Sequence, residues 1–289
     1  MPDPIDPADP AAAPINPLDS VGRPRIVSVY LATAGLLVGL VLLGGFLANQ
    51  HLRAAGPERL SGFLRAAGVS VAWIGVVTLV VAALSPVPRA ARLGLSRARL
   101  SRRGWLLAIL GGLALSQAID LALQLSGVGR GPALEVMIDA LGGARGRGLA
   151  AAVLIVGLGA GTVEELFFRG YAQRRLVARY GAPVGIAIAA ALFALAHGDP
   201  RHAAFAFCFA AFAGAVAHWS DSTAPAIALH VVNNTVSVLT IAAGLDGLEP
   251  RLPRLALAVA SAALAVGAVA SLRAVRREAA GWTSPTALG

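Results

Sequence analysis

The chain has 289 residues, of which 57% are hydrophobic and only 13% charged, and its mean hydropathy is +0.72. A soluble domain carries about 25% charged residues, so this composition excludes an ordinary soluble globular protein and indicates a membrane protein. The net charge of +9 reflects 24 basic residues, all of them arginine. These lie between apolar segments and do not form one patch, which argues against nucleic-acid binding.

Eight apolar segments follow one another along the chain. They are residues 26–48, 66–86, 105–126, 149–170, 182–198, 203–219, 224–245 and 254–272. A membrane helix needs about 20 apolar residues, so the pattern predicts an all-α fold, a polytopic membrane helical bundle with about eight transmembrane helices over 26–272. The segments within 149–245 are shorter or carry polar residues, which is typical of helices buried in a bundle or around a cavity.

The two ends of the chain differ from this apolar part. Residues 1–25 are rich in Pro, Asp and Ala and predict a disordered N-terminal tail, and residues 273–289 are expected to form a C-terminal tail. The two tails together with residues 89–103 and 169–179, on every second connection and its border, hold 15 of the 24 arginines. Because cytoplasmic loops are enriched in basic residues, both termini are predicted to be cytoplasmic.

Glu164 and Glu165 stand side by side in the fourth apolar segment, in the run Thr-Val-Glu-Glu-Leu-Phe-Phe-Arg-Gly at 162–170. One acidic residue at a membrane helix centre costs roughly 2.5–3.5 kcal/mol on insertion scales, so both must be paired, protonated or used. Residues four apart share a helix face, so Arg169 is expected to form an ion pair with Glu165. Glu164 points about 100° away and is the candidate functional carboxylate.

Two further residue pairs have the same four-residue spacing. Phe193 and His197 end the fifth segment, and His230 and Asn234 lie in the seventh. Glu164 and His197 are each 16 residues from the turn between their segments, so they are expected at the same depth. We therefore expect the polar side chains of the three segments to converge.

Such a group of side chains has the equipment for amide hydrolysis inside a membrane. A buried carboxylate facing the imidazole of His197 can take a proton from water. The second histidine, His230, and the amide of Asn234 supply neutral donors that suit an oxyanion. Asn233 is adjacent to Asn234 but points about 100° away, so it ranks below Asn234.

Two other patterns concern helix packing. Gly157 and Gly161 have the spacing that lets membrane helices approach closely. Gln117, Asp120 and Gln124 form a polar stripe in the third segment. Interhelical hydrogen bonding is the favoured interpretation of this stripe, ahead of a substrate path.

The order Glu-Glu-x-x-x-Arg, Phe-x-x-x-His and His-x-x-x-Asn on successive apolar segments resembles the type II CAAX prenyl endopeptidase family, also called CPBP intramembrane proteases or Abi proteins. The resemblance implies an intramembrane endopeptidase whose catalytic core covers about 149–245. It implies that Glu164 activates water with His197, and that His230 and Asn234 form the oxyanion site.

The same resemblance implies a supporting role for three residues, Glu165, Arg169 and Phe193. No metal or other cofactor is favoured, because the chain lacks His-Glu-x-x-His, the usual helical zinc signature. A zinc site of Glu164, His197 and His230 stays open as the alternative.

A non-catalytic membrane protein, either a proton-coupled transporter or a scaffold, is a second alternative. Transporters are commonly built from paired repeats, whereas the polar motifs here occur only in the second half of the chain.

The expected partners are the lipid bilayer and a peptide or protein substrate, either lipidated or bacteriocin-like. The lysine-free composition indicates a bacterial protein, so the expected location is the inner (plasma) membrane.

Overall fold

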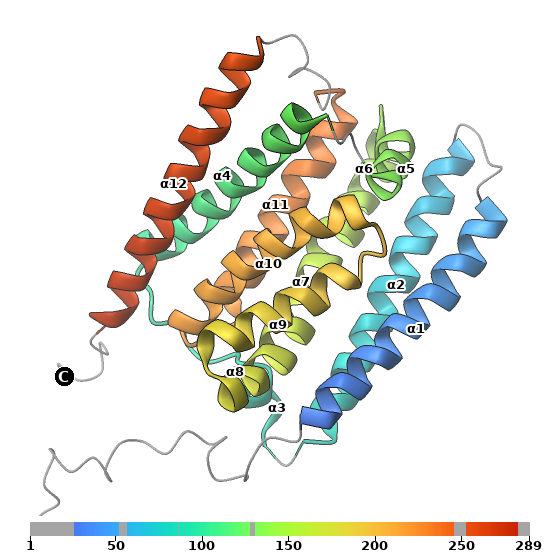
Figure 1. Ribbon diagram of the computed structural model, residues 1–289. Coiled ribbons are helices and arrows are strands. Elements are labelled where there is room, and N and C mark those ends of the chain that lie inside the picture. Colours follow the sequence, from blue (N-terminus) through green and yellow to red (C-terminus); the bar gives the residue numbers. More distant parts are fainter. Residues whose placement is uncertain (1–25, 52–56, 86, 128–130, 246–252, 283–289) are drawn as a thin grey trace, which may run out of the picture.

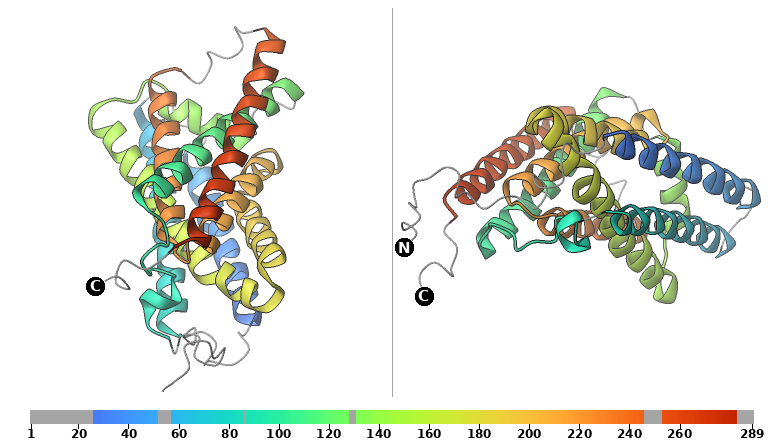
Figure 2. Two further views of the ribbon diagram at one scale, coloured as in Figure 1. Left: turned by 90° about the vertical axis from the view of Figure 1, so that its left-hand side faces the viewer. Right: turned by 90° about the horizontal axis from the view of Figure 1, so that it is seen from below.

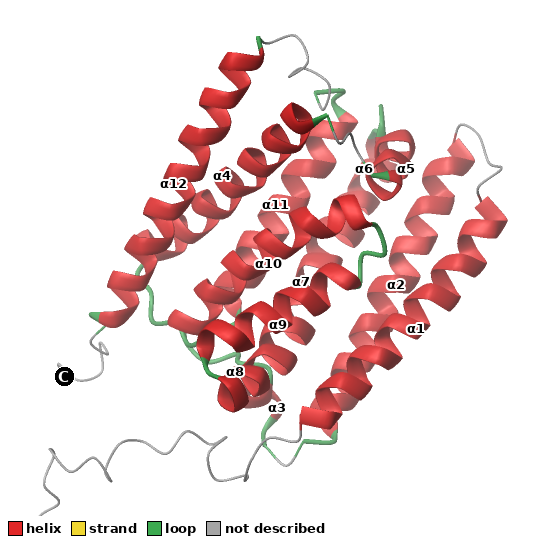
Figure 3. Cartoon of the chain, viewed as in Figure 1, coloured by secondary structure: helices red, strands yellow, loops and turns green. Residues whose placement is uncertain are grey.

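Figure 1 shows a computed structural model of the chain, which describes residues 26–51, 57–85, 87–127, 131–245 and 253–282. All regular secondary structure in these ranges is helical (Figure 3), which confirms the all-α prediction. The expected tail at 1–25 lies outside the described residues, as does the end of the chain from residue 283.

The helices in chain order are α1 (Ile26–His51), α2 (Pro57–Ala83), α3 (Arg89–Arg92), α4 (Arg102–Ser126), α5 (Pro132–Leu141), α6 (Gly146–Ala152), η3 (Val153–Ala160), α7 (Gly161–Glu165), η4 (Leu166–Gln173), α8 (Arg174–Tyr180), α9 (Ala182–Leu195), α10 (Pro200–Trp219), α11 (Ala224–Ala242) and α12 (Arg254–Ala280). Within the described ranges, six helical spans are long and apolar enough to cross a membrane. Two further apolar stretches, Val27–Leu43 in α1 and the whole of α9, are shorter. These eight match the positions of the eight predicted segments and confirm a polytopic membrane bundle.

Residues Gly146–Tyr180 form one continuous helix of 35 residues. Its α-helical parts are joined by two π-helical stretches, η3 and η4, which flank the short segment α7. The helix continues beyond residue 170, where the predicted segment ended. At about 1.5 Å per residue it exceeds the roughly 30 Å of a hydrocarbon core. π-Helical turns are rare and frequent at functional sites, and these two enclose Glu164 and Glu165.

Two other boundaries differ from the prediction. Helix α12 continues to Ala280, beyond the predicted end at 272, so the expected C-terminal tail begins within a helix. Helix α5 was not predicted, because its 10 residues are too few to span a bilayer. Asp199, the N-cap of α10, contacts the start of α5, where its Oδ2 accepts a hydrogen bond from Ala133 N at 3.2 Å.

Figures 1 and 2 show how the helices are arranged. Helices α4 and α12 pack together at one side of the bundle, and α1 packs with α2 at the other. Helices α7, α9, α10 and α11 lie between these two pairs. The predicted site residues lie on α7, η4, α9 and α11 and, for His197, in the turn after α9. Apart from Arg169, the largest buried side chains in this region are aromatic, Phe167, Phe168, Tyr171, Phe193 and Phe209.

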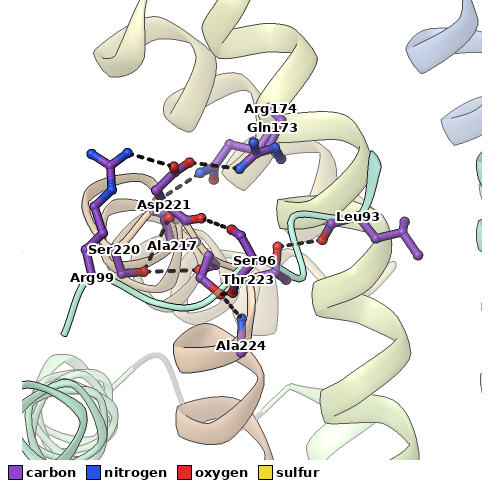
Figure 4. Close-up of polar contacts among 12 residues, drawn as sticks. Leu93, Ser96, Arg99, Gln173, Arg174, Ala217, Ser220, Asp221, Thr223 and Ala224 are labelled. Atoms are coloured by element: carbon purple, nitrogen blue, oxygen red, sulfur yellow. Dashed lines mark hydrogen bonds and ion pairs between the residues drawn. The ribbon is translucent and has the colours of Figure 1, made fainter. Parts of the chain in front are cut away.

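A polar cluster joins three parts of the chain at the end of the bundle that carries α3 and α8 (Figure 4), which we call the arginine-rich end. Thr223 Oγ1 donates to Leu93 O at 2.8 Å. The carboxylate of Asp221 forms ion pairs with Arg99 at 3.2 Å and Arg174 at 3.3 Å. These contacts fasten the loop after α3 to the α10–α11 turn and to the start of α8.

Candidate active site

A cavity of about 460 Å³ is bounded by α4, α5, α7, α10 and α11. Its lining includes all four residues that the sequence predicted as catalytic, Glu164, His197, His230 and Asn234. Three motifs separated by up to 70 positions in the chain therefore meet at one cavity, as expected. The remaining wall is largely apolar and includes Phe63, Leu134 and Met137.

Glu165 and Arg169 form the buried ion pair that their spacing predicted. Arg169 Nη1 lies 2.8 Å from Glu165 Oε1, and both side chains are shielded from solvent, at 1% and 0% exposure. The contact is an ion pair by distance, but neither Nη atom of Arg169 makes a hydrogen bond of good angle within the described residues. The guanidinium instead lies over the ring of Phe193, 4.5 Å from its centroid, a cation–π arrangement.

His230 connects the two adjacent glutamates. Its Nδ1 donates to Glu165 Oε1 at 2.7 Å, and its Nε2 lies 3.9 Å from Glu164 Oε2. The side chain of Glu164 is 18% exposed, because it faces the cavity, whereas that of Glu165 is closed off. The pair thus divides into a buried carboxyl that holds a histidine and an open carboxyl beside the same histidine.

His197 lies in the turn directly after α9. Its Nδ1 donates to Phe193 O at 2.9 Å, so in the neutral ring Nε2 carries the lone pair. Within the described residues the ion pair of Glu164 is with His230 and not with His197. The structure therefore places His197 at the same cavity as Glu164 but brings His230 closest to it.

Phe193 is the packing centre of the site. Its buried ring contacts the ring of His197, with centroids 4.7 Å apart, and that of His230, with centroids 5.9 Å apart. With Arg169 on the same ring, one aromatic side chain limits the orientations of three functional groups.

The two adjacent asparagines differ in their bonding. Asn234 Nδ2 donates to Val156 O at 3.2 Å, which ties α11 to η3. Asn233 is 6% exposed, lines the cavity, and its side-chain amide has no hydrogen bond within the described residues. Sequence reasoning ranked Asn233 below Asn234 from helix angle alone, and the free amide is visible only in the packed structure.

Two glycines allow the close approach of α11 to the helix with the glutamates. A Cβ on Gly161 would lie 2.9 Å from Val231 N, and one on Gly157 would lie 2.6 Å from Thr235 Oγ1. The helix contact that their spacing predicted is therefore present. Because Gly161 is one turn from Glu165 and Val231 follows His230, this approach makes the 2.7 Å contact of Glu165 with His230 possible.

The polar stripe of α4 makes different contacts from those expected. Gln117, Asp120 and Gln124 all line the cavity. Gln124 Nε2 donates to Asp120 Oδ2 at 2.9 Å, a bond within α4. In the described part of the chain none of the three makes a side-chain hydrogen bond to another helix, so the interhelical interpretation was wrong.

The zinc alternative requires Glu164, His197 and His230 to lie close enough together to bind one ion. Among the described residues, no three His, Cys, Asp or Glu side chains are grouped closely enough to hold a metal ion, and this includes Glu164, His197 and His230.

Comparison with known proteins identifies the segment that carries these motifs. Residues 146–236 match the model of the family described as type II CAAX prenyl endopeptidase Rce1-like. No curated protein and no solved structure matches the chain. The matched segment begins with α6 and ends within α11, so it contains all three motifs. The resemblance predicted from these motifs is confirmed for this segment: residues 146–236 are similar to the type II CAAX prenyl endopeptidases, and the long apolar helices indicate an integral membrane protein.

Proposed function

We propose that this protein is an intramembrane endopeptidase that hydrolyses a peptide bond of a membrane-associated peptide or protein, with Glu164 as the base. The observation that carries the proposal is the contact of Glu164 Oε2 with His230 Nε2 at 3.9 Å, at a cavity to which the matched segment contributes both residues. A carboxylate that is open to a cavity and close to an imidazole has the position required of a general base.

In the proposed reaction Glu164 takes one proton from a water molecule, and the water oxygen attacks the carbonyl carbon of the peptide bond. The lone pair on His197 Nε2 accepts the second hydrogen of this water and so orients it. When Glu164 returns its proton to the amide nitrogen, the C–N bond breaks. The products are a carboxyl group and an amine, so the atoms balance without a further reactant.

The carbonyl oxygen becomes an oxyanion during this attack and needs donors. His230 Nδ1 already donates to Glu165, so His230 can donate from Nε2 as well only when both ring nitrogens carry a proton. Asn234 uses one N–H for Val156 O and keeps its second one. The free amide of Asn233 at the cavity wall makes it a further donor in this proposal.

We propose that the mechanism is metal-free, because the donor set of Glu164, His197 and His230 does not form a metal-binding group. Cleavage should then be insensitive to 1,10-phenanthroline and EDTA. Loss of cleavage that added zinc restores would replace this mechanism with the zinc-dependent version.

The apolar wall and the volume of about 460 Å³ fit a short apolar peptide segment, since ligand pockets commonly measure about 300–1,000 Å³. Both substrate classes that the family resemblance implies, lipidated and bacteriocin-like peptides, remain in the proposal. We place the protein in a bacterial inner membrane with both termini in the cytoplasm.

The test compares Glu164→Gln with Glu165→Gln, and Glu135→Gln on the exposed face of α5 is the matched control. The purified variants are reconstituted in lipid nanodiscs and incubated with peptides extracted from membranes, and new termini are mapped by mass spectrometry. Glu164→Gln should lower cleavage by about 10²–10⁴-fold with unchanged folding, and Glu135→Gln should cleave like the parent. Full cleavage by Glu164→Gln would exclude this base, and absence of cleavage by the parent would favour a transporter or scaffold.

A further inference from the structure

The α4 wall of the cavity carries a carboxylate that the proposed reaction does not use. Asp120 is half-buried and lines the same cavity as Glu164 and His230. Its only hydrogen bond in the described part of the chain comes from the amide of Gln124, within α4. No arginine of the described residues forms an ion pair with it.

This position is costly for a carboxylate. Acidic residues inside membrane helices are expensive, and they commonly face a bundle interior or a water-filled cavity and mark the path of a substrate or ion. The amide of Gln124 offers a hydrogen bond but no compensating charge. A cationic group that enters the cavity would supply both.

The other ionisable groups at the cavity do not supply that cation. Glu164 is an acid, and His230 contacts the two glutamates. His197 is bonded to Phe193 O, and the ring of His202 packs on that of His197 with centroids 4.8 Å apart. Arg201 lines the cavity but has an interaction partner of its own.

The position of Asp120 in the chain separates it from the matched family segment. It lies on α4, whereas the family match covers 146–236. The hydrolytic groups thus come from the matched segment, whereas the part of the cavity wall that α4 and α5 form lies outside it.

We propose that Asp120 is a specificity-determining residue that binds a basic side chain of the peptide substrate, Lys or Arg, while the bond to be cleaved lies at Glu164. The neighbouring amides of Gln117 and Gln124 complete a polar strip along which the substrate backbone lies. This inference rests on the proposed function and specifies its substrate class, an apolar peptide with one basic residue at a fixed distance from the cleaved bond.

One experiment tests the cation preference without any cleavage. Cys208 is replaced by Ser, and Ser237→Cys then places a single thiol at the cavity wall. The thiol reacts in nanodiscs with a cationic (trimethylammonium) or an anionic (sulfonate) ethyl methanethiosulfonate. The ratio of the cationic rate to the anionic rate should fall about fivefold or more in Asp120→Asn, since one nearby charge is removed.

Asp139→Asn is the matched control, because Asp139 is exposed on α5 and does not line the cavity. It should leave the ratio unchanged. An equal ratio in the parent and in Asp120→Asn, an equal fall in Asp139→Asn, or a thiol that reacts with neither reagent would overturn the proposal.

The second arm uses the membrane-peptide pool. Cleavage sites of the parent should be enriched in Lys or Arg at one position, and the enrichment should disappear in Asp120→Asn and change to Asp or Glu in Asp120→Lys. If the parent cleaves nothing, the proposed function fails while the thiol rates still judge the cation site. If cleavage occurs without a basic preference, the proposed function stands and the role of Asp120 is excluded.

Discussion

His230 Nδ1 lies 2.7 Å from Glu165 Oε1, the same oxygen that Arg169 Nη1 approaches at 2.8 Å. One carboxylate oxygen therefore holds both an arginine of its own helix and a histidine of α11. Sequence reasoning assigned Glu165 only to Arg169. The structure adds a second function for it, the orientation of the imidazole next to Glu164.

Loss of one partner of the Glu165–Arg169 pair should lower the free energy of unfolding strongly. Arg169→Met leaves the Glu165 carboxylate buried with only His230 beside it. Removal of one partner of a buried pair typically costs about 3–5 kcal/mol, and we expect a loss of that size in the free energy of unfolding, measured by denaturant titration in detergent micelles. The double variant Glu165→Leu with Arg169→Met should recover part of it, because no buried charge remains. A change below about 1 kcal/mol in the single variant would contradict the buried-pair description.

Substitution of the two asparagines should have different effects on the free energy of unfolding. Asn233→Ala removes an amide without a hydrogen bond in the described structure and should leave the unfolding free energy nearly unchanged. It should lower kcat by about 10²–10³-fold, as for other oxyanion donors. Asn234→Ala should lower kcat and also cost about 1 kcal/mol, since it removes the hydrogen bond to Val156 O. Full kcat in Asn233→Ala would remove this residue from the reaction.

Gly161→Ala tests the close approach of α7 and α11. The added methyl group would meet the backbone of Val231, 2.9 Å from N and 3.0 Å from Cα, so the helices must move apart. Overpacking of this kind typically costs about 1–3 kcal/mol, and the displacement of His230 from Glu165 should also lower kcat. Gly35→Ala is the control, because a Cβ there has nothing within 4 Å. Equal thermal stability and activity of the two variants would argue against the packing role.

Asp221 should contribute to stability at the arginine-rich end. It has a left-handed backbone (φ 51°) and pairs with Arg99 and Arg174 while its side chain is 45% exposed. Exposed pairs contribute about 0–1 kcal/mol each, so Asp221→Ala should lower the unfolding free energy by about 1–2 kcal/mol, measured in micelles. Asp139→Ala, which breaks a single exposed pair with Arg59, should change it by less than about 1 kcal/mol. Asp221→Asn tolerates the left-handed backbone and should fall between them.

The proposed topology has a consequence for access to the cavity. Helix α5, the start of α10 and the end of α11 border the cavity at the end of the bundle opposite the arginine-rich end. With cytoplasmic termini, that end faces away from the cytoplasm. In a Cys208→Ser background, Arg147→Cys should react with a membrane-impermeant maleimide in intact cells. Arg97→Cys should react only after the cells are opened, and the reverse pattern would invert the topology.

The sequence alone determined the features that depend on local geometry and on the apolar environment. Runs of apolar residues predicted the eight helices because the bilayer requires an internally bonded backbone. The four-residue spacing predicted the contact of Glu165 with Arg169, and the Gly157/Gly161 spacing predicted a close helix approach. The family resemblance followed from three motifs in order, because those residue types are rare in apolar helices.

Only the tertiary structure decided which helix faces meet. That His230 contacts Glu165 as well as Glu164, that the amide of Asn233 lines the cavity, and that Asp120 faces it all depend on the rotation and depth of separate helices. Two π-helical stretches, which the regular spacing of 3.6 residues does not anticipate, alter that rotation beside the site. Side chains far apart in sequence therefore acquire their partners from packing, and spacing within one helix cannot supply them.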